Sequence, residues 1–157
     1  MRSGQLSDAR LAVAEAIEES GFHEAWYWER DGHAGPFSSR PVCIGQAETS
    51  DYLILLLGET LTEVTRDEYF AAKGAAAVVI IFVPSTCQRD AEAEAFFQAE
   101  ATTVTYGTYR SPADLKSRVL KSLQAHAVRI LRERQLDRQL VTNPATQLTA
   151  ATGNGGS

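Results

Sequence analysis

The chain has 157 residues, a length that corresponds to one domain with a hydrophobic core of ordinary size. Its formal net charge of −5 argues against nucleic acid or an anionic membrane surface as the partner of the whole domain. The longest apolar run, Ala75 to Val83, is about half as long as a membrane-spanning helix requires.

The cysteines and histidines show no pattern of a redox or metal site. Cys43 and Cys87 lie far apart and form no C-x-x-C motif, which argues against a disulfide framework and against zinc. His23, His33 and His126 have no carboxylate or thiol at ligand spacing. The sequence therefore predicts no metal and no cofactor. Because the amino-terminal stretch has no apolar segment of a secretory signal, we expect a cytoplasmic protein.

The first predicted helix begins at Ser7, whose side chain can cap the free N–H groups of the first turn. Its apolar residues recur at helical spacing, and Gly21 suits the left-handed residue that ends such a helix. Residues 22–28 are rich in aromatic side chains and close to alternating, so they are predicted to form a strand. A loop then leads into a second helix, capped by Ser38 or Ser39.

Two continuous apolar runs follow, at residues 51–57 and 75–83. Runs that do not alternate are typical of strands covered on both faces, as in a parallel sheet between layers of helices. Between them, residues 62–74 are predicted to form a helix that ends at Gly74.

The last part of the chain predicts one further strand between two helices. Residues 88–101 have a helical pattern, and residues 102–106 are predicted to be a strand. A long final helix, capped by Ser111 with Pro112 in its first turn, closes a domain that we expect to span residues 1–135. Residues 136–157 are small and polar towards their end and are expected to be a flexible tail or the start of a linker.

Helices that alternate with strands indicate an α/β fold with a mostly parallel sheet of about four strands. Ligands of such sheets bind beyond the carboxyl ends of the strands. Gly58 follows one predicted strand, and the segment Pro84 to Thr86 follows another. Doubly wound domains of this size normally begin with a central strand, for which there is no room between Met1 and the first helix.

The order and the amino-acid sequences of several segments resemble those of the DUF4062 domains, which look like relatives of the TIR and nucleoside deoxyribosyltransferase-like group. The matching stretches are "ARLAVAEAI" from Ala9, "SDYLILLLG" from Ser50 and "TRDEYFAA" from Thr65, and the likeness extends roughly from Leu6 to Leu131. The resemblance implies a three-layer αβα domain of the flavodoxin or TIR type. It also implies that the family's first strand and its hydroxyl-rich loop fall before Met1.

Glu68 is the catalytic residue that the resemblance implies. In TIR-like relatives an acidic residue at this place lies over the nicotinamide ribose, and the resemblance implies cleavage of an N-glycosidic bond. A carboxylate can stabilise the oxocarbenium charge that develops in such a reaction. A purely structural interpretation remains open, in which Glu68 complements the helix dipole or forms a capping box with Thr65 at the N-cap.

Other residues of these segments are candidates for ligand binding. Gly58 is expected to permit a turn with a positive φ, and alternatively to allow a phosphate or ribose to approach the backbone. Ser39 and Arg40 stand at a helix start, where an anion could bind, although a plain cap with a solvated arginine fits equally. The full set of expected ligand-binding residues is Gly58, Glu59, Thr65, Tyr69, Ser39 and Arg40.

The function expected from these features is a signalling or interaction module of a larger multidomain protein, with a nucleotide-type pocket at the carboxyl edge of the sheet. Its expected partners are NAD or another nucleotide, further copies of itself, or adjacent domains. The alternative is a TIR-like NAD or nucleoside N-glycosidic hydrolase that uses Glu68, and deoxyribosyl transfer is a third reading. An enzyme requires Glu68 unpaired in a cleft, whereas a module does not.

Overall fold

The structure is a computed structural model that describes residues 3–33 and 38–142, and the side chains of residues 6–33 and 38–138. The chain divides into two compact units, residues 1–120 and residues 121–157. The first unit contains all the strands that the structure describes. The second unit contains the continuation of the final helix, which runs past its predicted end at Gln135 to Thr142. The flexible tail was predicted for residues 136–157; residues 136–142 are helical instead, and the remainder lies outside the described residues.

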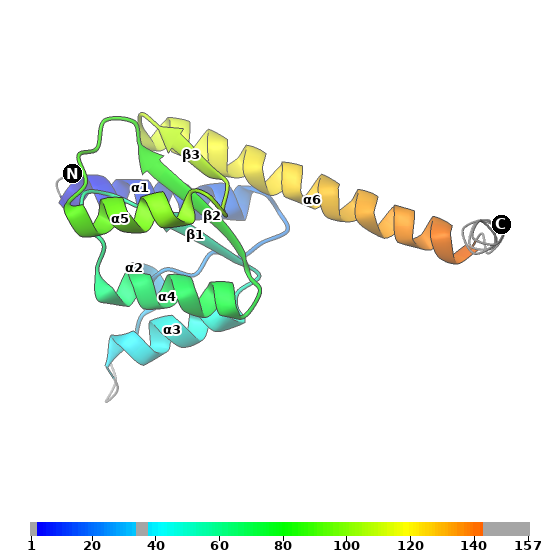
Figure 1. The fold of residues 1–157 in the computed structure, drawn as a ribbon, viewed down its shortest axis with the longest axis horizontal. Helices are drawn as coiled ribbons and strands as arrows, with labels where there is room; N and C mark the ends of the chain where they lie inside the picture. Colours follow the sequence, from blue (N-terminus) through cyan, green and yellow to red (C-terminus); the bar gives the residue numbers. More distant parts are fainter. Residues whose placement is uncertain (1–2, 34–37, 143–157) are drawn as a thin grey trace, which may run out of the picture. The chain divides into compact units, whose positions relative to one another are not determined.

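From Ser39 onwards, helices and strands alternate along the first unit, after two preceding helices (Figure 1). The helices are α1 (Ser3–Glu19), α2 (Trp28–Asp31), α3 (Ser39–Thr49), α4 (Glu63–Gly74), α5 (Ala91–Glu100) and α6 (Pro112–Thr142). The strands are β1 (Tyr52–Leu56), β2 (Val78–Pro84) and β3 (Tyr106–Tyr109).

The described strands form a sheet in the order β1-β2-β3, with both neighbouring pairs parallel. The predicted α/β class and the parallel sheet are therefore confirmed, but the described residues form three strands where about four were predicted. Leu55 lies opposite Ile81, and Phe82 lies opposite Gly107. A Cβ atom at Gly107 would come within 2.8 Å of the Phe82 ring, so only glycine leaves this ring its space.

One face of the sheet carries the main hydrophobic core. Leu55 and Leu57 from β1 and its end, and Ile81 from β2, pack with Tyr69 of α4 and Phe97 of α5. Connections that move in one direction along a parallel sheet place their helices on one face, because each crossover is right-handed. The core of this face is therefore built by two successive crossovers.

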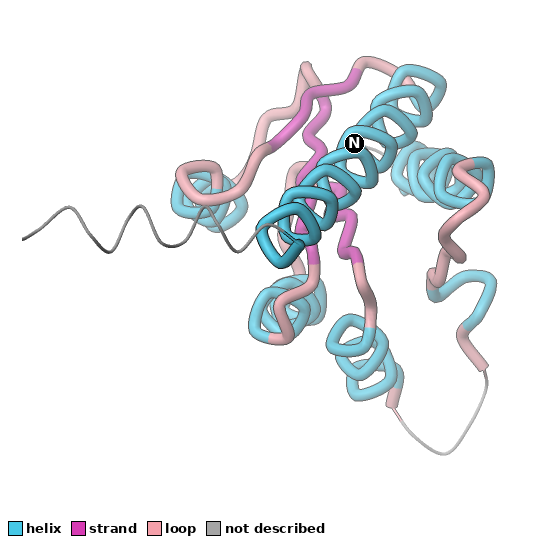
Figure 2. Tube along the Cα trace, turned by 90° about the vertical axis from the view of Figure 1, so that its right-hand side faces the viewer, coloured by secondary structure: helices cyan, strands magenta, loops and turns pink. Residues whose placement is uncertain are grey.

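Helix α1 covers the sheet from the other side (Figure 2). Its buried side chains are small, and most of them recur at helical spacing: Ala9, Ala12, Val13, Ala14 and Ala16. The first turns of α6 lie beside it, because Lys116 pairs with Glu15 at 2.9 Å and with Glu19 at 2.6 Å. Helices on both faces explain why the strands are continuous apolar runs.

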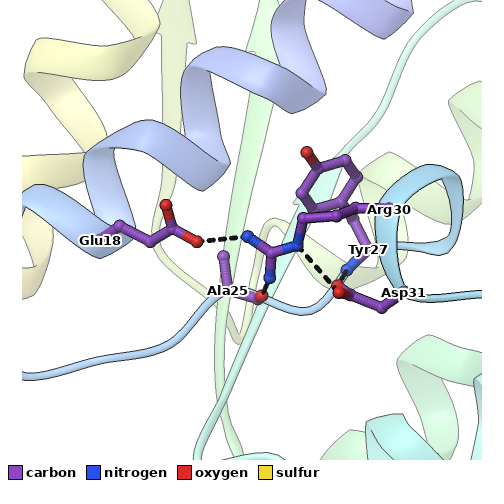
Figure 3. A network of polar contacts seen from close by, with 5 residues as sticks. All are labelled: Glu18, Ala25, Tyr27, Arg30 and Asp31. Atoms are coloured by element: carbon purple, nitrogen blue, oxygen red, sulfur yellow. Dashed lines mark hydrogen bonds and ion pairs between the residues drawn. The ribbon is translucent and has the colours of Figure 1, made fainter.

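The strand predicted at residues 22–28 is wrong. The backbone N–H of Tyr27 donates to the carboxylate of Asp31 at 3.0 Å instead of to a neighbouring strand, and Trp28 already begins α2. Arg30 holds the segment in place by bonding Glu18, the Ala25 carbonyl and Asp31 (Figure 3). Local ion pairing has therefore replaced the strand pairing that the aromatic pattern suggested.

The last strand lies later in the chain than predicted. Residues 101–104 form a turn that extends the end of α5, because the N–H groups of Thr103 and Val104 both donate to the Glu100 carbonyl at 2.9 Å. The hydroxyl of Thr102 donates to the Ala99 carbonyl at 2.9 Å and strengthens this turn. Threonines that suit a strand serve here as hydrogen-bond donors to a helix end.

The helix ends agree only in part with the sequence. Helix α1 begins at Ser3, so the predicted cap at Ser7 is wrong. Gly21 has a φ of 73° after the end of α1, as predicted. The cap of α6 is also confirmed, since the Ser111 hydroxyl accepts the N–H of Asp114 at 3.2 Å.

Candidate functional site

Helices α3 and α4 lie side by side (Figure 1). Because α3 leads into β1 and α4 leads away from it, both helices begin at the carboxyl edge of the sheet and run in the same direction. We call the polar side chains between their first turns the α3–α4 seam. The seam consists of Arg40, Cys43, Glu63, Asp67 and Glu68.

Arg40 is engaged within the seam. Its guanidinium bonds the Asp67 carboxylate and lies 3.6 Å from the carboxylate of Glu63. All three side chains are exposed, so these ion pairs stabilise the fold by less than about 1 kcal/mol. An anion bound at the start of α3 would therefore compete with two carboxylates for Arg40.

Glu68 lies half-buried and faces Cys43, whose thiol donates a hydrogen bond to its carboxylate. Burial raises the pKa of Glu68 above its usual range, and the bond from Cys43 only partly offsets this. Burial, followed by the charge of Glu68 and the hydrogen bond to it, raises the pKa of the Cys43 thiol to about 11. Cys43 is consequently a protonated donor at neutral pH and not a nucleophile.

The N-cap of α4 is Thr62, so the capping box predicted between Thr65 and Glu68 is wrong. The hydroxyl oxygen of Thr62 accepts the N–H of Thr65 at 3.2 Å, and the two hydroxyls lie 2.9 Å apart. Thr65 is therefore already inside the first turn. Glu68 consequently sits one turn too late to reach the capped N–H groups.

Tyr69, an expected ligand-binding residue, has none of its surface exposed. Its hydroxyl donates to the Glu100 carboxylate at 2.5 Å, and Lys73 bonds the same oxygen at 2.5 Å. These three residues tie the end of α4 to the end of α5. The structure thus places Tyr69 in the core and gives its hydroxyl a partner inside the protein.

Gly58 and Glu59 follow β1 at the carboxyl edge of the sheet. Gly21 is the glycine with a positive φ among those described, so the left-handed turn predicted at Gly58 is wrong. The carbonyl of Glu59 accepts the N–H of Asp90 at 2.8 Å, which places Glu59 beside the start of α5. Ser39 is exposed at the first residue of α3.

The carboxyl edge also contains a tyrosine that the sequence did not single out. Tyr109 is the last residue of β3, and its carbonyl accepts the N–H of Ser85 at 2.8 Å. Its side chain is only 5 % exposed, and its hydroxyl has no hydrogen-bond partner among the described residues. Burial raises the pKa of this phenol, and the neighbouring Cys87 raises it further.

The expected site residues therefore do not gather in one place. Arg40 and Glu68 both belong to the α3–α4 seam, Tyr69 lies in the core, and Gly58 and Glu59 belong to the carboxyl edge together with Tyr109. The sequence pointed to this edge through the segment that follows β2. Tyr109 was missed because the predicted strand, residues 102–106, ended before it. The partnership of Cys43 with Glu68 had no local signal, because it joins two different helices.

No protein-family model matches the chain, and no curated protein and no solved structure matches it. The resemblance to DUF4062 domains therefore rests on the quoted segments alone. Within residues 3–33 and 38–142, no three His, Cys, Asp or Glu side chains gather in a way that could hold a metal ion. No helix in the same residues is long and apolar enough to cross a membrane.

Replacing Glu68 by glutamine is expected to raise the free energy of unfolding at about pH 7 by up to about 1 kcal/mol. The raised pKa means that the folded protein keeps the proton of Glu68 to a higher pH than the unfolded chain does. Stability therefore falls as the pH rises from the unfolded to the folded pKa, and the penalty is absent below both. Urea unfolding at about pH 4 and about pH 7 measures the difference.

The control for this experiment is Glu63→Gln, because Glu63 is in the same helix with 79 % of its side chain exposed. This variant should leave the stability within about 0.5 kcal/mol of the original. A Glu68→Gln protein that is clearly less stable at neutral pH would show that the charged carboxylate stabilises the fold.

Proposed function

We propose that this domain is a non-catalytic signalling or assembly module that binds a nucleotide-type ligand at the carboxyl edge of its sheet. Its protein partners are further copies of the chain or adjacent domains. The proposal keeps the function implied by the resemblance to DUF4062 domains and excludes bond cleavage by Glu68.

The engagement of Glu68 carries this proposal. The Glu68 carboxylate lies between two helices and accepts a hydrogen bond from the Cys43 thiol. It is therefore not an unpaired group in a cleft. A carboxylate that stabilises an oxocarbenium ion must face the ribose and must be ionised. Burial of Glu68 disfavours ionisation, which argues against that role.

The carboxyl edge supports the binding part of the proposal. Three chain segments meet there, joined by the hydrogen bonds from Asp90 N–H to Glu59 and from Ser85 N–H to Tyr109. Parallel sheets bind their ligands at this edge, where the Tyr109 hydroxyl has no partner among the described residues.

A second candidate function is an N-glycosidic hydrolase, and the raised pKa of Glu68 is the observation that favours it. A carboxylic acid that keeps its proton near neutral pH can donate it to the leaving base of a nucleoside. This reaction requires the seam to open so that Cys43 releases the carboxyl group.

Incubation with NAD⁺ separates the two functions. Nicotinamide release is followed by chromatography and NAD⁺ binding by saturation-transfer NMR, for the original chain, Glu68→Gln and Glu63→Gln. The module binds NAD⁺ equally in all three proteins and releases no nicotinamide, because neither carboxylate takes part.

Two other results overturn the proposal. Release of nicotinamide by the original chain and by Glu63→Gln, but not by Glu68→Gln, would establish the hydrolase. Absence of binding in all three proteins, with circular dichroism showing that they are folded, would remove the nucleotide ligand altogether.

A further inference from the structure

The second compact unit carries a helix with large apolar side chains on its surface. Residues 121–142 of α6 belong to this unit, and we call the part whose side chains are described, residues 121–138, the α6 extension. Val128, Leu131 and Leu136 are 46 %, 61 % and 59 % exposed on it. Apolar side chains that gather on one exposed surface mark a site of interaction with another molecule.

These side chains do gather on one face of the helix. Val128, Arg132 and Leu136 follow one another at intervals of four residues, and Leu131 lies beside them, because an α-helix has 3.6 residues per turn. We call these four residues the apolar face. The acidic residues of the extension fall on the other side of the helix: Glu133 and Asp137. The apolar face is therefore accompanied by positive charge alone.

The two compact units carry opposite charges. Residues 121–157 contain five basic and two acidic residues, whereas residues 1–120 contain ten basic and eighteen acidic ones. One of the two acidic residues of the extension, Glu133, is already paired with Arg129 at 2.8 Å. The formal charges of the units are thus +3 and −8, so the extension of one copy is attracted by the first unit of another.

Helix α1 presents an acidic surface of complementary character in the first unit. Asp8, Leu11, Glu15 and Glu18 recur at intervals of three and four residues and are all exposed, Leu11 by 49 %. Phe22, just after the end of the helix, is 86 % exposed. Carboxylates around exposed apolar side chains match the apolar face of the α6 extension, where an arginine stands among such side chains.

The cations of the first unit only partly neutralise this surface. Lys116 pairs with both Glu15 and Glu19, and Arg30 pairs with Glu18. Two cations thus serve three carboxylates, in exposed pairs that are weak and exchange readily. The two helical surfaces also match in length, since α1 has 17 residues and spans about 26 Å, close to the length of the extension.

We infer that the apolar face of the α6 extension docks on the acidic surface of α1 in a second copy of this chain. In a two-fold pair each copy gives its extension and receives that of the other, so the contact forms twice. A second copy is favoured over a nucleic acid, because the −8 charge of the attached first unit repels a polyanion. The inference rests on the assembly part of the proposed function and names the partner and both surfaces.

Sedimentation velocity measures the pairing of the full chain, between about 5 µM and about 200 µM protein at about 150 mM salt. The original chain should form dimers as its concentration rises. Leu131→Gln and Arg132→Glu should each weaken the dimer about tenfold or more, because they remove apolar contact area and reverse a charge that faces carboxylates. The matched control is Arg134→Glu, which makes the same charge change on the other side of the helix and should weaken the dimer less than about threefold.

An exchange of charges between the two helices tests α1 as the acceptor. Glu15→Lys alone should weaken the dimer as Arg132→Glu does, because two cations then face each other. An equimolar mixture of these two variants should form dimers again, since each of the two contacts then joins opposite charges. Circular dichroism of every variant shows that the fold is retained, and Glu15→Lys leaves Lys116 its bond to Glu19 at 2.6 Å.

Each contrary result has its own meaning. Dimers of equal affinity in all variants would show that these surfaces are not the interface, while the assembly part of the proposed function stands. A mixture of Arg132→Glu and Glu15→Lys that stays monomeric would overturn α1 as the acceptor. An original chain that is monomeric throughout would remove both the inference and self-assembly, and the NAD⁺ experiment would then decide the ligand by itself. A monomer that co-sediments with phosphatidylserine vesicles would overturn the second copy in favour of an anionic membrane.

Discussion

Ile81→Ala is expected to lower the free energy of unfolding by about 3 kcal/mol, the largest stability loss that we predict for a side chain of the sheet. Ile81 lies in the middle strand with none of its surface exposed, and it packs in the cluster of Leu55, Tyr69 and Phe97. Truncation removes buried apolar surface and leaves a cavity that a sheet fixed on both sides cannot close. Urea unfolding at neutral pH measures the loss.

Ile80→Ala is the matched control because Ile80 is the preceding residue and faces the α1 side of the sheet. Ile80 is only partly buried, so its truncation should cost about 1–2 kcal/mol. Equal losses for the two variants would mean that both faces of the sheet are covered equally well. A loss below about 1 kcal/mol for Ile81→Ala would contradict the core described for the α4 and α5 side.

Glu100→Ala is expected to cost about 2–3 kcal/mol, because it removes the shared partner of two donors. The Tyr69 hydroxyl is left unpaired in the core, and Lys73 loses a bond of 2.5 Å. Lys73 remains 40 % exposed and can regain water, which keeps the loss below that of a fully buried ion pair. Glu92→Ala in the same helix is the control, since the Glu92 side chain is 60 % exposed, and it should cost less than about 1 kcal/mol.

The pH dependence of Glu100 has the opposite sign to that of Glu68. Burial alone would raise the pKa of Glu100, but the hydrogen bonds from Lys73 and Tyr69 outweigh burial and hold the pKa below its usual range. This contribution is complete above the unfolded pKa and is lost as the pH falls through the folded one. Glu100→Gln should therefore lose less stability than the original chain between about pH 5 and about pH 3. An unchanged acid transition in that variant would contradict the assignment.

Much of the fold could be predicted from the sequence. The apolar runs at residues 51–57 and 75–83 became β1 and β2, and the helices around them formed near their predicted places. The strand at residues 22–28 could not be excluded locally, because its replacement depends on Arg30 reaching back to Glu18. Likewise, the start of β3 was set by threonines that bond the end of α5 instead of a neighbouring strand.

The candidate site was less accessible from the sequence than the fold. The acidic residue Glu68 could be named from its segment, but its partner comes from another helix. The burial of Tyr69 could not be predicted from the sequence either, because a phenol can bond a ligand as readily as it bonds the carboxylate of Glu100. That the Tyr109 hydroxyl has no partner in the described part of the chain became apparent only when the end of β3 was placed beside the loop after β2.

By itself, the sequence determined which stretches form helices and core strands and that these strands lie parallel between layers of helices. Apolar spacing, caps and turns depend on a few neighbouring residues, so they can be predicted from the sequence without knowledge of tertiary contacts. Only the tertiary structure decided which carboxylate is paired, which phenol is buried and which hydroxyl has no partner among the described residues. Those properties depend on groups far apart in the chain, whose burial and hydrogen bonds exist only once the helices pack on the sheet.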